Sequence, residues 1–84
     1  MPLRQLSSSD VAWLLEQIGI ELKRRGKEDV FEGTFRGKTR VVIVPRNKRR
    51  IPWGTLGSIL RQAGLTRREA ENILRTKGKW TPEG

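Results

Sequence analysis

Residues 30–45, VFEGTFRGKTRVVIVP, decide the fold that this sequence predicts. Two runs rich in Val, Phe, Ile and Thr flank a short RGK break at 36–38, a pattern typical of a β-hairpin. We therefore expect strands at 30–35 and 39–45. The run at 41–44 is apolar on both faces, which favours the second of these strands as the central strand of its sheet.

A short amphipathic helix and a further strand are predicted before the hairpin. Ser7-Ser8-Ser9 offers a helix N-cap, Asp10 suits the first turn, and Gly19 supplies a C-terminal stop. Apolar and charged residues then alternate over 20–23, as in a half-buried strand, and the basic segment 23–27 predicts a turn. The apolar face of the helix, with spacing i, i+3, i+4, i+7, comprises Val11, Leu14, Leu15 and Ile18.

Two helices are predicted after the hairpin. Pro52 and Gly54 mark the entry to the first, and Gly64 ends it. Its apolar stripe comprises Leu56, Ile59, Leu60 and Ala63. Thr66 and Glu69 form a capping box for a short last helix, whose inward residues are Ala70, Ile73 and Leu74. The predicted class is α+β, with a three-stranded antiparallel sheet and helices packed on one face.

Length and composition limit the possible functions. Eighty-four residues fit one domain, which we place at 1–75, followed by a flexible basic tail at 76–84. The absence of Cys and His excludes disulfides, thiolate zinc sites and the usual zinc and iron ligands, so we expect neither metal nor cofactor. No apolar stretch reaches the roughly 20 residues that span a bilayer. We expect a cytoplasmic protein with no membrane partner.

The charge distribution favours a nucleic-acid partner. Eighteen Lys and Arg against nine Asp and Glu give a net charge of +9, and no acidic residue occurs between Gly33 and Arg68. Excess charge also serves solubility or a membrane surface, but a long stretch with cations of one sign is typical of a phosphate-binding face. One cluster precedes the predicted helix at 52–64, where a helix N-terminus favours anions: Arg46, Lys48, Arg49 and Arg50. A second cluster, which would also protect an edge strand, comprises Lys23, Arg24, Arg25 and Lys27.

The predicted α-β-β-β-α order with a basic loop is similar to the double-stranded RNA-binding domain, which recognises duplex RNA by shape, phosphate and 2′-hydroxyl contacts. Residues 51–66, IPWGTLGSILRQAGLT, with VIVP at 42–45, resemble the signature of the HicA toxin family, and the resemblance covers about residues 9–75. These are small ribonucleases of type II toxin–antitoxin systems. The resemblance implies a metal-independent mRNA endoribonuclease, with RNA (mRNA or duplex) as its ligand and a HicB-like antitoxin as its protein partner.

The departures from the family pattern concern its active site. Family members carry Gly-Ser-His at the start of the second strand, and the histidine is catalytic. This chain has GKEDVF at 26–31, with Glu28 at the histidine position. A carboxylate can act as a base but repels the phosphate that must approach, and Lys27 is at most a helper. We therefore expect altered or lost catalysis, with a surface turn of no catalytic role as the alternative for Glu28.

Trp53 replaces the lysine usual after the family's proline, and Gly57 falls within a helix. Trp53 would stack on an unpaired base or, as we favour, pack over the end of the adjacent helix. Trp13 is expected at the edge of the core and Trp80 in an exposed tail.

The predicted RNA contacts combine both clusters with the hairpin and the helix start: Lys23, Arg24, Arg25, Lys27, Lys38, Arg40, Arg46, Lys48, Arg49, Arg50, Trp53 and Thr55. One alternative is a non-enzymatic RNA-binding module. A second is a DNA-binding helix-turn-helix over 58–74. This second alternative is weaker, because Leu60 stands where that motif needs a small residue and because Glu69 and Glu71 would face the groove.

Overall fold

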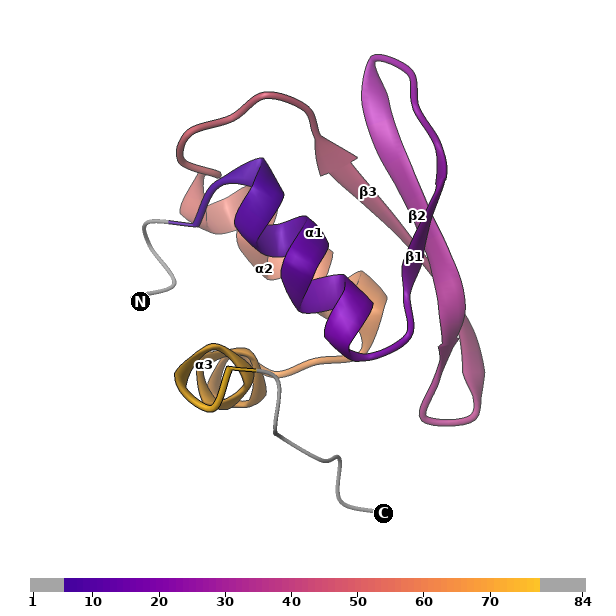
Figure 1. Cartoon of the computed structure of the whole chain (residues 1–84), viewed down its shortest axis with the longest axis vertical. Helices are drawn as coiled ribbons and strands as arrows, with labels where there is room; N and C mark the ends of the chain where they lie inside the picture. The colour runs from indigo at the N-terminus through magenta and orange to yellow at the C-terminus, as the bar shows by residue number, and fades with distance from the viewer. Residues whose placement is uncertain (1–5, 78–84) are drawn as a thin grey trace.

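The computed structural model describes residues 6–77 and has the predicted order of elements (Figure 1). The helices and strands are α1 (Ser8–Gln17), β1 (Glu21–Arg24), β2 (Glu28–Phe35), β3 (Lys38–Pro45), α2 (Trp53–Ala63) and α3 (Arg67–Arg75). The three strands form one antiparallel sheet. The α+β class is therefore confirmed, and the order is that of a double-stranded RNA-binding domain.

The central strand of the sheet is β2, because the strand order is β1-β2-β3. The prediction that the 39–45 strand is central was wrong. Val42 and Val44 are buried, whereas Val41, on the opposite face, is 47% exposed. The apolar residues of this run thus lie on both faces of an edge strand, although helices cover only one of these faces. A run of four apolar residues does not by itself distinguish this case from a strand covered on both faces.

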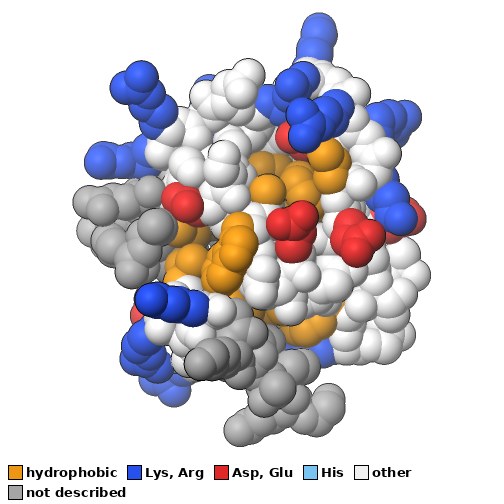
Figure 2. All heavy atoms as spheres, in the orientation of Figure 1, with side chains coloured by type: hydrophobic (Ala, Val, Ile, Leu, Met, Phe, Trp, Pro, Cys, Tyr) orange, Lys and Arg blue, Asp and Glu red, His pale blue; other side chains and the backbone are white. Residues whose placement is uncertain are grey.

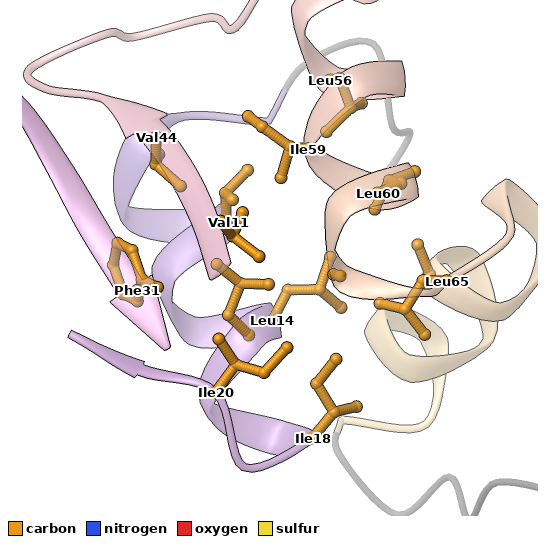
Figure 3. Packing of buried hydrophobic residues seen from close by; sticks show 14 of the residues in the cluster. Val11, Leu14, Ile18, Ile20, Phe31, Val44, Leu56, Ile59, Leu60 and Leu65 are labelled. Atoms are coloured by element: carbon orange, nitrogen blue, oxygen red, sulfur yellow. The ribbon is translucent and has the colours of Figure 1, made fainter. Parts of the chain in front are cut away.

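The core lies between the sheet and the first two helices (Figures 1 and 3). From β2, Phe31 and Phe35 point toward the helices, and Phe31 pairs with the buried Val42 of β3. Their partners from α1 and α2 include the stripes that the sequence predicted: Val11, Leu14, Leu15, Leu56, Ile59, Leu60 and Ala63. Helix α3 packs against both α1 and α2, burying Ala70 and Ile73, while Leu74 is half-buried.

The predicted helix ends are present. Ser7 and Asp10 form a capping box at α1, and Thr66 and Glu69 form one at α3. Gly64 ends α2 at φ 82°, a left-handed conformation that favours glycine. Thr76, where the predicted tail begins, caps α3 by donating from Oγ1 to the carbonyl oxygen of Asn72. Residues 78–84, including Trp80, lie outside the described part of the chain.

Two further features concern the edges of the fold. Trp13 is half-buried and packs against the core, as predicted. The amide of Ile43 in β3 donates to Oε1 of Gln62 in α2 at 3.0 Å, so a helix side chain satisfies a backbone group of the edge strand. Within residues 6–77, no helix is long and apolar enough to cross a bilayer.

Candidate nucleic-acid interface

The structure brings the two predicted cation clusters together at one end of the sheet. Strand β1 ends and β2 begins at this end, and β3 ends there as well, because Glu28 pairs with Pro45. Nη1 of Arg46 donates to the carbonyl oxygen of Gly26 at 3.0 Å and so links two segments that are 20 residues apart. We call this surface the basic end. Its eight cations, all exposed, are Lys23, Arg24, Arg25, Lys27, Arg46, Lys48, Arg49 and Arg50.

A hollow of about 310 Å³ lies beside the basic end, between the start of α1, the β1–β2 turn and the β3–α2 loop. Ala12, Leu22 and Phe31 contribute apolar surface to it. Its remaining lining is polar or charged: Ser8, Ser9, Glu16, Arg25, Asp29, Arg46, Asn47 and Lys48. Figure 2 shows Lys and Arg side chains at the top of this face, above an apolar patch, and others along its left and lower rim.

Ser8 fixes the rim of the hollow. Its hydroxyl donates to the carbonyl oxygen of Pro45 at 2.6 Å and accepts from the amide of Lys48 at 3.0 Å. The Ser8 amide donates to the carbonyl oxygen of Lys48 at 2.9 Å. These three bonds hold the β3–α2 loop, which we call the basic loop, against the first turn of α1. The cations on the loop therefore start from an ordered backbone, which lowers the entropy cost of binding a ligand.

Asp29 is a site residue that the sequence analysis missed. It lies two residues before Phe31 in β2 and so shares the helix-covered face, where it lines the hollow. Its Oδ1 lies 3.4 Å from Nε of Arg46, an ion-pair distance, yet this buried oxygen accepts no hydrogen bond from residues 6–77. The period-two alternation Asp29, Phe31, Gly33, Phe35 would have identified the face on which Asp29 lies.

Glu28, at the family's histidine position, is the first residue of β2 rather than part of a turn, and it is exposed. Adjacent residues of a strand point to opposite faces. Glu28 therefore lies on the open face of the sheet, away from the hollow. Lys27 precedes it in the β1–β2 turn and is also exposed. The two neighbouring carboxylates thus face different environments.

Two of the predicted RNA contacts, Lys38 and Arg40, lie toward the opposite end of the sheet, next to the β2–β3 turn. Arg40 donates from Nε to the carbonyl oxygen of Phe35 at 3.1 Å. A Cβ built on Gly64 would approach the Arg40 guanidinium to 2.7 Å, so Arg40 packs closely on the end of α2. Arg40 therefore contacts other parts of the fold and does not lie at the basic end.

Arg36 completes this second end by contacting the start of α3. Its guanidinium donates from Nη1 to the carbonyl oxygen of Gly64 at 3.1 Å and to Oε1 of Glu69 at 2.9 Å, and it forms an ion pair through Nη2 with Oε2 of Glu69. The hydrogen bonds from Arg36 lower the pKa of the Glu69 carboxyl, and Glu69 in turn raises the pKa of Arg36. We call Arg36, Arg40, Gly64 and Glu69 the closed end.

Trp53 and Thr55 begin α2, directly after the basic loop. Trp53 is 39% exposed, and the guanidinium carbon of Arg67 lies 4.4 Å from the centroid of its ring. A Cβ on Gly57 would meet Nη2 of Arg67 at 2.9 Å. Both helix residues that depart from the family pattern, Trp53 and Gly57, are therefore in contact with one arginine of α3.

The structure thus shows an α+β domain with a three-stranded antiparallel sheet and exposed cations gathered at one end of that sheet. Comparison with protein families is more specific. The model of the HicA toxin of bacterial toxin–antitoxin systems matches residues 8–65, from the start of α1 into the connection between α2 and α3. Because the match spans more than half of the chain, the protein belongs to the HicA toxin family. No curated protein matches the sequence.

Proposed function

We propose that the protein is a cytoplasmic RNA-binding toxin that contacts the RNA backbone with its basic end, with altered or lost cleavage. The observation that carries this proposal is the convergence of two separate cation clusters around one hollow. The N-terminus of α2 follows the basic loop and adds the partial positive charge of its unpaired N–H groups. Family membership supports an RNA ligand and an antitoxin that covers the basic end with an acidic surface.

The test compares two double variants that each remove two positive charges. Arg49→Ala with Arg50→Ala alters the basic end, whereas Arg61→Ala with Arg68→Ala alters exposed cations on α2 and α3. We expect the first to weaken RNA binding about tenfold at 0.1 M salt and to flatten the plot of log affinity against log salt by about 1.4, because each phosphate contact on a single strand contributes about 0.7. Equal losses in both variants would assign binding to net charge alone.

The catalytic part of the proposal follows from the groups present. The chain has no histidine, and Glu28 lies on the open face with Lys27 as its cationic neighbour. RNA cleavage through the 2′-hydroxyl needs a base and an acid, and this pair supplies them poorly. We expect slow or absent cleavage of mRNA in the presence of a metal chelator. We expect Glu28→His to raise cleavage, as measured on the same mRNA by gel electrophoresis. Rapid cleavage by the parent that persists in Glu28→Ala would contradict this assignment.

The two alternatives give different results in binding assays. If the protein is a non-enzymatic RNA-binding module, both the parent and Glu28→His bind RNA and leave it intact. A helix-turn-helix protein prefers duplex DNA over duplex RNA in competition at fixed salt. In this structure Glu69, on the second helix of that motif, is paired with Arg36 of the β2–β3 turn. The structure therefore offers no specific observation in favour of the DNA-binding alternative.

A further inference from the structure

The hollow beside the basic end is lined by cations and also by the partly exposed carboxylate of Asp29. We propose that it binds a single nucleotide of the RNA, with the phosphate on its cations and the ribose 2′-hydroxyl hydrogen-bonded to Asp29. This inference rests on the proposed function and adds to it a device that distinguishes RNA from DNA. It assigns a role to Asp29, which the resemblance to the family does not.

Arg46 supplies an ordered phosphate contact. Its Nη1 is held by the carbonyl oxygen of Gly26 at 3.0 Å, and its Nε lies 3.4 Å from Oδ1 of Asp29. A guanidinium carries five N–H donors in a fixed plane, so the donors on Nη2 are available to an anion. Arg25 and Lys48 line the same hollow and add two further cations. These three cations outnumber the two carboxylates of the lining, Glu16 and Asp29, so the hollow favours an anion such as a phosphodiester over a neutral ligand.

The dimensions and the apolar surface of the hollow indicate one nucleotide rather than a duplex. Its volume of about 310 Å³ is near the lower limit for small-ligand sites. Leu22 and Phe31 provide apolar surface against which a sugar or base edge can pack. A duplex is too wide to enter a hollow of this size. The ligand is therefore an unpaired nucleotide, in a loop, a bulge or a single strand, where a nucleotide can be splayed out toward the protein.

Asp29 selects the chemical group that enters with the phosphate. A carboxylate only accepts hydrogen bonds, so it has nothing to offer a phosphate oxygen. Its Oδ1 is buried beside Nε of Arg46, and the rest of the side chain, which is 21% exposed, lines the hollow. An incoming hydroxyl donates to this exposed part of the carboxylate, whereas a 2′-deoxyribose offers it no donor. The 2′-hydroxyl is the group that allows a protein to distinguish RNA from DNA.

The experiment measures the affinity of the full chain for a single-stranded RNA oligonucleotide and for the DNA of the same sequence. The variant is Asp29→Ala. The matched control is Glu32→Ala, which removes the same charge from the same strand but on the exposed face. We expect the parent and the control to prefer RNA by about tenfold and Asp29→Ala to bind both oligonucleotides about equally, because a hydrogen bond to a charged group carries this preference.

A second variant covers the case in which Asp29→Ala does not fold, as checked by circular dichroism. Asp29→Asn keeps the shape and an uncharged acceptor, so we expect an intermediate preference for RNA. An unchanged preference in the Asp29 variants overturns the inference. Equal binding of RNA and DNA by the parent also overturns it and leaves the basic end as a backbone-binding surface. Failure of the parent to bind either oligonucleotide overturns the proposed function itself.

Discussion

The two ends of the sheet use arginine in opposite ways. At the closed end, Arg36 and Arg40 bond to backbone carbonyl oxygens, and Arg36 pairs with Glu69 of α3. At the basic end, eight Lys and Arg residues are exposed, and Arg46, which has an acidic partner within 4 Å, bonds to the β1–β2 turn. One end therefore holds a helix against the sheet, and the other presents cations around a hollow.

This difference shows that a stretch of basic residues is not a single functional unit. The segment without acidic residues includes cations of both ends, and composition alone does not distinguish the cations of one end from those of the other. Arg40 and Lys38 were predicted to bind RNA together with Arg46. The structure places them at the opposite end of β3. The distinction between structural and available cations depends on partners from other elements, such as Gly64 and Glu69.

The largest expected effect tests how tightly the half of the sheet near the closed end is packed. Gly33 pairs with Arg40, and a Cβ on it would lie 2.2 Å from the carbonyl oxygen of Gly19 and 2.8 Å from Cα of Ile20. Because both atoms belong to the backbone, we expect Gly33→Ala to lower the free energy of unfolding by about 3 kcal/mol or more. The measurement is chemical denaturation.

The control for this variant is Gly26→Ala in the turn of the basic end. A Cβ there would lie 3.7 Å from the carbonyl oxygen of Glu28, an ordinary van der Waals contact. We expect a change of less than about 0.5 kcal/mol. Similar losses in the two variants would show that the two ends of the sheet are equally tightly packed.

A smaller expected effect concerns the pH dependence of the stability that the closed end contributes. The hydrogen bonds from Arg36 lower the pKa of Glu69 in the folded state, so the unfolded state binds more protons in the acidic range. The contribution of Glu69 is complete above its ordinary pKa of 4.5 and is lost as pH falls through the lowered folded pKa. With allowance for solvent screening, we expect Glu69→Gln to lose about 1 kcal/mol at pH 7.

The measurement for Glu69 is thermal or chemical unfolding of parent and variant between pH 7 and the acid range. The difference in stability between them should shrink on acidification, because the parent loses the same interaction. A difference that stays constant with pH would mean that the charge of Glu69 does not stabilise the closed end. RNA affinity should be unchanged at pH 7, since Glu69 lies away from the basic end.

The smallest expected effect concerns the start of α2 beside the basic end. A Cβ on Gly57 meets only the end of the Arg67 side chain, which can move. Alanine improves helix propensity by about 1 kcal/mol, and partial loss of the Arg67 contact with Trp53 offsets about half of this gain. We expect Gly57→Ala to stabilise the fold by about 0.5 kcal/mol in denaturation. A loss above about 1 kcal/mol would show that Arg67 is held rigidly.

Local signals in the sequence predicted the elements of the fold. The two capping boxes, the stop at Gly64 and the apolar stripes of α1 and α2 depend on residues a few positions apart, and all are present. The order of strands was harder to predict. Val41–Val44 was assigned to a central strand because the sequence does not show which face of a sheet is covered.

The candidate site could not be predicted from local sequence patterns, because it is formed by contacts between distant parts of the chain. The bond from Arg46 to Gly26, the clamp of Ser8 on Pro45 and the pairing of Arg36 with Glu69 join residues 20, 37 and 33 positions apart. No local pattern reports such pairs. Asp29 is the exception, because alternation in β2 would have placed it on the inner face, although not beside Arg46.

The bond between Gln62 and Ile43 has a consequence for how other chains can attach to this protein. A peptide that extended the sheet beside β3 would need the backbone groups along that edge. Along this edge, the Ile43 amide already donates a hydrogen bond to the Gln62 side chain. Such a peptide would first have to displace Gln62, so the bond protects this edge against strand-by-strand association with other chains, including copies of the protein itself.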